Sequence, residues 1–495
     1  MIFKNDIGML KLPDIIQIYI DEFNVSDERK LMITGEEYYR NNNDINKREM
    51  IRYENETPIL DTTKPNHKLS HAFMHTLVDD KVNYLMVKPY TLECNDESYL
   101  ENIKEILGKR FQNKMSKLAT AASNKGISWL HPYINKSGEM KFKIVPAEQL
   151  IAWWIDSDHE DIQAIIWYYV VEIYEGTQKK YETKVEYWEP ERVEYYTIVD
   201  ELNKYGKPER KIIKLDGEKY LNQLDNGEYE SVNEIGHYTI NGQPGYWGKV
   251  PFIPFKNNDM ELPDLQFVKS LIDDYDLTRS DIANLLEEIK DIIYALRGYD
   301  GESLSEFNHN IAYYHAVKVD GDNGGVEKIE HTIDIDAAEK HYKQLKKDIN
   351  DFGQGIEKDA DAIGNSPSGI ALKFLYSGLD LKCNALEENF KWSFEQLLYF
   401  VNHYMGIVNI PVSDEEISII FNRDIAVNES QAIEDCQNSK SIISDETIVA
   451  NHPWVKDLDE ELKKIEEENR TKEDEMMQQN EQDMGNLDGG DSGGQ

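Results

Sequence analysis

Positive charge is scarce in this chain. It has 54 lysines and arginines against 94 aspartates and glutamates, which gives a formal net charge of −40 over 495 residues. A protein that wraps nucleic acid needs a basic surface that neutralises phosphates, so this deficit argues against that class. It does not exclude a protein past which DNA moves without adhering.

Cysteines and long apolar runs are also scarce. Cys94, Cys383 and Cys436 are odd in number and far apart, which argues against a disulfide framework or a CxxC metal site and indicates reduced thiols in a cytosolic product. No window reaches the roughly 18 continuous apolar residues of a membrane span. The N-terminus MIFKNDIGML lacks the basic and apolar regions of a signal peptide. We therefore expect neither a membrane span nor a secretory leader.

Enzyme motifs are missing as well. Neither a GxxxxGK[ST] phosphate loop nor an HExxH zinc motif occurs. One GxSxG match surrounds Ser492, but a nucleophile elbow needs a strand–turn–helix context, and the chain beyond Leu462 has almost no bulky apolar residues. The match is interpreted as chance, and neither a catalytic residue nor a cofactor is predicted.

The apolar residues that are present, 40% of the chain, follow two periods. A period of 3.6 predicts helices over much of the first 126 residues and again from Pro263. From Ile127 a period of 2 predicts strands, beginning with a hairpin whose turn is Lys136–Gly138. The alternation over Val185–Trp188 predicts a sheet with one solvent-facing side. The fold class is therefore α+β, mainly helical, in several domains.

The stretch from Ile335 to Met405 predicts two helices joined by one loop. The first helix, Asp336–Phe352, has an apolar and a charged face. The loop, Gly353–Ser368, is rich in glycine and acidic residues. The second helix, Gly369–Met405, is apolar and very long for a globular protein.

The charged face of the first helix is a lysine stripe. At 100° per residue Lys340, Lys343 and Lys347 lie within about 60° of each other. The opposite side, which we expect to be buried, consists of Ala338, Tyr342, Leu345, Ile349 and Phe352. Two interpretations of the lysines remain open: contact with DNA phosphate, or a solvated face on which Glu339, Lys343 and Lys347 form helical pairs.

Three patterns resemble metal sites. The run Asp156–Asp161 gathers acids and one histidine, but its spacing fits no EF-hand, and it lies where two predicted strands meet. Asp320–Gly325 resembles a calcium loop but reads better as a hairpin turn. His67, His71 and His75 follow each other at i, i+4 and i+8 of one predicted helix, without a supporting ligand pattern. We interpret these as a solvated turn, a hairpin and a partly exposed helix face, and predict no metal.

Four stretches carry a resemblance to a known family. They are NHKLSHAFMHTLVDDKVNYLMVKP, AASNKGISWLHPYIN with KIVPAEQLIAWW, LPDLQFVKSLIDDYDLTRSDIANLLEEIKDIIYALRGYDG, and GNSPSGIALKFLYSGLDLKCNALEENFKWSF. In order and spacing, over about Ile15 to Asn422, the chain resembles the portal proteins of tailed double-stranded DNA bacteriophages, of the siphophage type with Gram-positive hosts. Glu172–Gly248 and the acidic C-terminus add nothing to this resemblance.

The resemblance implies a ring of about twelve copies at one capsid vertex, through which DNA is packaged and later ejected. It implies a multi-domain portal fold of wing, stem, clip and crown. By order, these are wing 1–261, stem helix 262–290, clip 291–335, stem helix 336–352, tunnel loop 353–368, wing 369–423 and crown 424–462. The composition beyond Leu462 separately predicts a disordered acidic tail, 463–495.

The resemblance also implies partners and a location. The partners are other copies of the chain, double-stranded DNA in transit, the terminase large subunit, a head-tail adaptor protein, and major capsid and scaffolding proteins. No membrane is involved. The location is the virion's portal vertex, after assembly in the host cytoplasm.

Two sets of site residues follow as hypotheses. The DNA tunnel would be lined by Lys340, Lys343, Lys347, Glu357, Lys358, Asp359 and Asp361. The clip docking surface would contain Glu302, Glu306, Tyr313 and Tyr314.

Two other functions remain open. One is a metal-dependent nuclease or other DNA-processing enzyme, built on Asp156 and Asp158. The other is a purely structural ring through which no DNA passes.

Overall fold

The computed structural model describes residues 11–202, 208–217, 221–223, 229–231, 235–240, 242–288, 293–297, 325–329, 335–356, 369–423, 429–455 and 461–471, with a few single positions between them. The chain forms two compact units. The first comprises residues 1–356 and 378–424, and the second comprises residues 357–377 and 425–495.

The first unit begins with helices, as its 3.6-residue period predicts. Ser26 separates the first two, and its hydroxyl accepts the Arg29 N–H at 3.1 Å, which caps the second helix. A small hairpin follows, and the third helix ends at Met86, before Pro89. The elements are α1 Leu12–Val25, α2 Asp27–Tyr39, η1 Asp44–Lys47, β1 Ile51–Glu54, β2 Thr57–Leu60, α3 Phe73–Met86, β3 Thr91–Glu93, α4 Glu97–Leu107 and α5 Phe111–Lys125.

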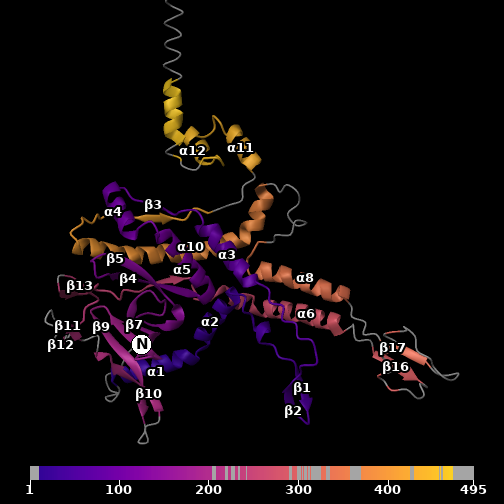
Figure 1. Ribbon diagram of the computed structural model, residues 1–495. Helices are drawn as coiled ribbons and strands as arrows, with labels where there is room; N and C mark the ends of the chain where they lie inside the picture. The colour runs from indigo at the N-terminus through magenta and orange to yellow at the C-terminus, as the bar shows by residue number, and fades with distance from the viewer. Residues whose placement is uncertain are drawn as a thin grey trace, which may run out of the picture. The chain divides into compact units, whose positions relative to one another are not determined.

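Two antiparallel sheets follow (Figure 1). The larger has the order β10-β9-β8-β7-β6, and the smaller the order β15-β4-β5, with the predicted hairpin at its edge. Their strands and the 3-10 turn between them are β4 Ile127–Ile134, β5 Met140–Val145, η2 Ala147–Gln149, β6 Leu150–Trp154, β7 Ile162–Glu175, β8 Gln178–Glu189, β9 Arg192–Leu202, β10 Pro208–Leu215 and β15 Ile253–Lys256. Two short strand pairs form small sheets of their own. They are β11 Leu221–Gln223 with β12 Tyr229–Ser231, and β13 Tyr238–Ile240 with β14 Gln243–Gly245.

The prediction of one solvent-facing side is wrong at Val185–Trp188, because all four side chains are buried. Tyr187 packs on Trp153, with ring centroids 5.6 Å apart, while Trp188 packs on Phe252 at 5.6 Å. Phe252 directly precedes β15, so the second sheet's segment covers the side predicted to be wet. The Glu186 carboxylate is satisfied there by Trp188 Nε1 at 3.0 Å and by a tyrosine hydroxyl.

Two helices of the first unit run side by side (Figure 1). They are α6, Lys269–Glu288, preceded by η4, Asp264–Phe267, and α8, Ile335–Phe352. Between them in sequence the structure describes one antiparallel pair, β16 Ile293–Arg297 with β17 Gly325–Ile329. The turn predicted at Asp320–Gly325 lies outside the described residues, apart from Gly325, where β17 begins.

The long helix is α10, Gly369–Ile407, two residues longer than predicted. Within the first unit it buries side chains three or four residues apart: Leu379, Cys383, Leu386, Phe390, Phe394, Leu397, Val401 and Met405. Phe390 packs edge-on against Phe255 of β15, with centroids 4.9 Å apart. After α10, β18 Ser418–Ile420 pairs with β3. Through the β18–β3 pair that follows it, α10 therefore connects the end of the first unit with its start.

The second unit is helical where it is described. It contains α11 Glu429–Asn438, α12 Asp445–Ala450 and a helix over 461–471. Residues 463–471 therefore depart from the disorder predicted for 463–495, and the remainder of that segment lies outside the described residues. Glutamate, lysine and arginine dominate 463–471, and these are good helix formers.

Candidate functional site

Helix α8 presents two faces, as its sequence predicts. Leu345 and Ile349 are buried. Tyr342 lies under the Arg279 guanidinium of α6, 4.7 Å from ring centroid to Cζ. His341 Nε2 lies 3.1 Å from Oδ2 of Asp274, which also belongs to α6. The contacts with α6 therefore fix the rotation of α8 about its axis.

The lysine stripe lies on the exposed face. Lys340, Lys343 and Lys347 are all exposed. Lys343 Nζ is 2.6 Å from Glu339 Oε1, and this hydrogen bond raises the pKa of Lys343. In the part of the chain that the structure describes, Lys340 and Lys347 form no ion pair. The stripe thus offers two unneutralised cations and one that a local acid already partners.

Phe352 departs from the prediction that it is buried, because its exposed fraction is 64%. It lies about 60° around the helix from Ile349, at the edge of the apolar stripe, and α8 ends there. No described element of the first unit covers that edge at the last turn.

The predicted loop begins with a helix-terminating turn. Gln354 has a positive φ of 53°. Its N–H donates to Asp351 O at 3.3 Å, and the N–H of Gly355 donates to Asn350 O at 2.8 Å. These are the two hydrogen bonds of a Schellman motif. The acids and lysine predicted further along the loop, Glu357, Lys358, Asp359 and Asp361, lie outside the described residues.

Of the four residues predicted for the clip docking surface, Tyr313 alone falls within the described residues. It is 71% exposed and stacks on the His309 ring, with centroids 5.8 Å apart. Glu302, Glu306 and Tyr314 lie outside the described part of the chain.

The acidic run Asp156–Asp161 is a turn between β6 and β7, as predicted. The Asp156 carboxylate accepts the backbone N–H groups of Asp158, Glu160 and Asp161 at 2.9–3.1 Å. These hydrogen bonds lower the pKa of Asp156. Its oxygens are therefore engaged in holding the turn together.

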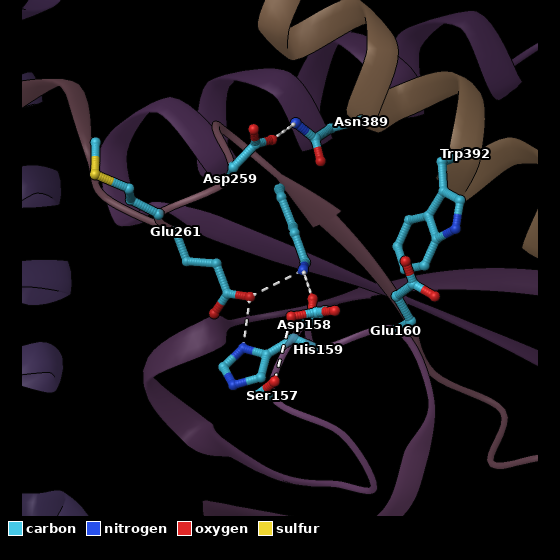
Figure 2. Close-up of a pocket in the computed structure, with 10 residues that line it drawn as sticks. Ser157, Asp158, His159, Glu160, Asp259, Glu261, Asn389 and Trp392 are labelled. Carbon is cyan, nitrogen blue, oxygen red and sulfur yellow. Dashed lines mark hydrogen bonds and ion pairs between the residues drawn. The ribbon is translucent and has the colours of Figure 1, made fainter.

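The turn borders a cavity of about 490 Å³ (Figure 2). In that view His159 faces Glu261, whose carboxylate lies 2.8 Å from the ring nitrogen. The Lys256 ammonium lies 3.2 Å from the same carboxylate and donates to the Asp158 carbonyl at 3.3 Å. Lys256 thus pairs with the Glu261 carboxylate, whereas at Asp158 it contacts only the backbone carbonyl. Among the described residues no group of histidine, cysteine and acidic side chains is placed to hold a metal ion.

The three histidines do not share a helix, which corrects the prediction. Only His75 lies in α3, because the helix begins at Phe73 and residues 67–72 have no regular secondary structure. His71 Nδ1 lies 2.7 Å from the buried Asp276, and His67 Nε2 lies 2.6 Å from Glu287. Both acids belong to α6, so His67 and His71 hold the segment that precedes α3 against that helix.

Comparisons with known proteins agree over most of the chain. A family model described as phage portal protein, SPP1 Gp6-like, matches residues 22–475. The portal protein of Bacillus phage SPP1 is 33% identical over 466 residues, covering 92% of this chain and 86% of the relative. The portal protein of Clostridium phage phiCD119 is 30% identical over 458 residues, covering 89% of this chain and 93% of the relative.

A solved structure described as the neck of a native GTA particle, computed with C12 symmetry, aligns over 77% of this chain and 89% of its own. The identity is 11% and the TM-score 0.38, so nothing further rests on it. Separately, none of the described helices combines the length and apolarity of a membrane span.

Proposed function

Because the chain belongs to the SPP1 Gp6-like family of phage portal proteins, which are virion components, we propose that it forms a closed ring through which phage DNA is packaged and ejected. The ring contains about twelve copies, related by a cyclic axis. The observation that carries this proposal is the match to the family over residues 22–475. The resemblance recognised in four stretches of the sequence supports the same assignment.

The lysine stripe of α8 faces the lumen in this proposal. Exposed lysines contact phosphate groups whatever the base sequence, which suits DNA that slides through the ring. The net charge of −40 limits how tightly the rest of the chain can hold DNA. Three lysines per copy therefore supply brief contacts against an otherwise repulsive background.

The remaining partners follow from the same assignment. The clip, residues 291–335, docks the terminase large subunit during packaging and a head-tail adaptor afterwards, with exposed Tyr313 on the docking surface. Aromatic side chains are enriched at such interfaces. Assembly takes place in the host cytoplasm with major capsid and scaffolding proteins.

Charge reversal tests the lumen assignment. Phage carrying Lys340→Glu, Lys343→Glu and Lys347→Glu together should assemble rings but package or retain about tenfold less DNA, because the contact becomes repulsive. The measurement is DNA content per particle, with ring assembly followed by imaging.

The control makes the same change in net charge elsewhere. Lys30, Lys104 and Lys141 each pair with an acid two or three residues away, at 2.9–3.2 Å. Lys343 forms a comparable local pair with Glu339, four residues away, at 2.6 Å. Reversal of these three should leave packaging intact. Unchanged packaging in the α8 variant, or equal loss in both, would contradict the lumen assignment.

No observation favours the nuclease alternative: the Asp156 carboxylate accepts three backbone N–H groups of its own turn, and the described residues include no group placed to hold a metal ion. A purely structural ring remains an outcome of the experiment: rings that form normally while DNA content stays independent of the α8 lysines.

A further inference from the structure

The ammonium groups of a buried and a partly buried lysine share one buried carboxylate in the first unit. Lys81 Nζ of α3 lies 2.9 Å from Asp264 Oδ2, and Lys382 Nζ of α10 lies 3.0 Å from the same oxygen. Lys81 and Asp264 are 1% and 3% exposed. Although burial raises the pKa of Asp264, the charges of Lys382 and Lys81 lower it to about 2. The cluster joins the start of the α6 segment to two other helices.

Asp264 does not need Lys382 for its neutralisation. Lys81 supplies one full positive charge, and Asn257 Nδ2 donates to Asp264 Oδ1 at 2.9 Å. Lys81 also donates to Asn257 Oδ1 at 2.6 Å. Burial lowers the pKa of Lys81 to about 8, with Lys382 contributing. Lys382 is thus a second, excess cation, which a buried site tolerates only with further acceptors.

That further acceptor is the start of the loop. Lys382 Nζ donates to the Gly353 carbonyl at 2.8 Å. Gly353 follows the last residue of α8 and is itself buried. A carbonyl at the C-terminal end of a helix carries partial negative charge and lacks an intrahelical partner. The ammonium supplies both the opposite charge and the missing donor.

Two close contacts hold the same turn. Leu77 of α3 fills the space beside Gly353 and Gly355. A Cβ added to Gly353 would lie 2.8 Å from Leu77 Cδ1, and a Cβ added to Gly355 would lie 2.4 Å from Leu77 Cδ2. On the α10 side, the Lys382 ammonium donates to the Gly353 carbonyl at 2.8 Å. Three contacts from two helices thus converge on Gly353–Gly355.

We propose that Lys382 is a positioning residue for the loop that begins at Gly353: its ammonium fixes where, and in which direction, the chain leaves α8. The positioning concerns the folded chain alone. Its consequence for DNA passage rests on the proposed function.

Lys382→Met tests the proposal because it removes the ammonium and leaves Lys81 and Asp264 as a balanced pair. The turn should loosen while the protein stays folded. Hydrogen exchange of the Gly353 and Gly355 amides, which donate to Ile349 O and Asn350 O, should become about tenfold faster. The fold should persist, because the variant does not leave Asp264 without a cation.

Two further variants sharpen the result. Lys382→Arg keeps the cation and should retain wild-type exchange. Lys391→Met, on the same helix but paired with Glu387 at 2.7 Å, should leave the turn unchanged. Unchanged exchange in Lys382→Met, equal acceleration in Lys391→Met, or loss of the whole fold in Lys382→Met would each overturn the proposal. This exchange needs no DNA, so its outcome is separate from that of the packaging experiment.

Discussion

At the scale of single residues, buried charge gathers where helices meet. Asp264 carries one negative charge between two ammonium groups, and Asp276 is fully buried against His71 and Asn43. Removing one partner of such a pair costs several times more than breaking a pair in water. The acids of the first unit therefore do structural work that the net charge of −40 does not reveal.

Acid should weaken the fold through Asp264. Its folded pKa of about 2 lies below the ordinary value of 3.8, so between these pH values the unfolded chain binds more protons than the native one. The stability from Asp264 is then present above about pH 4 and lost as pH falls to about 2. Lys382→Met removes one cation, so the pKa of Asp264 should rise and this loss should shrink.

Denaturant unfolding of both proteins between pH 2 and 5 measures the difference. Lys104→Met is the control, because Lys104 pairs at 3.2 Å with a surface acid and such pairs contribute little. Identical pH dependence in wild type and Lys382→Met would show that the charge of Lys382 does not contribute to the low pKa of Asp264.

At the scale of elements, helix ends decide how the loop is held. The α8 helix, the turn after it and α3 meet at Leu77, which is 3% exposed. An isolated turn with a non-glycine residue at positive φ is strained, and here Gln354 occupies that position. Packing from neighbouring helices compensates for that strain.

Leu77→Ala should therefore cost about 2–5 kcal/mol of unfolding free energy, because it leaves a cavity beside two glycines. It should also speed exchange in the turn. Val87→Ala, at the end of the same helix and 56% exposed, should change stability by less than about 0.5 kcal/mol. Denaturant unfolding compares them, and equal effects would mean that Leu77 is not a core residue.

The periodicity of apolar residues predicted the bounds of the long helices well, but it did not predict which distant segments contact each element. The bounds of α8 and α10 agree with the pattern to within two residues, because each helix buries its own apolar stripe. The face of β8 at Trp188 is buried because Phe252 packs on it. The positions of His67 and His71 are set by their contacts with acids of α6. Contacts between segments so far apart leave no periodic signal.

The candidate site divides in the same way. The lysine stripe could be predicted, because helical spacing alone puts Lys340, Lys343 and Lys347 on one face. Lys382 could not, because its acceptors, Asp264 and the Gly353 carbonyl, come from other parts of the chain. Phe352 lay at the edge of the predicted stripe, where the end of the helix decided its exposure.

At the scale of the whole molecule, the proposal requires many copies with α8 turned inward. A single copy exposes the lysine stripe to solvent on the same terms as any surface lysine. Only a closed ring gives the stripe one common lumen, where the large negative charge of every copy opposes tight binding of the same DNA.

The most direct test is an image reconstruction of the purified, assembled protein at a resolution that traces α8. We expect a closed ring of about twelve copies, with a central hole that admits a DNA duplex and with Lys340, Lys343 and Lys347 facing it. A monomer, an open chain of copies, or a ring in which these lysines face outward would contradict the proposal.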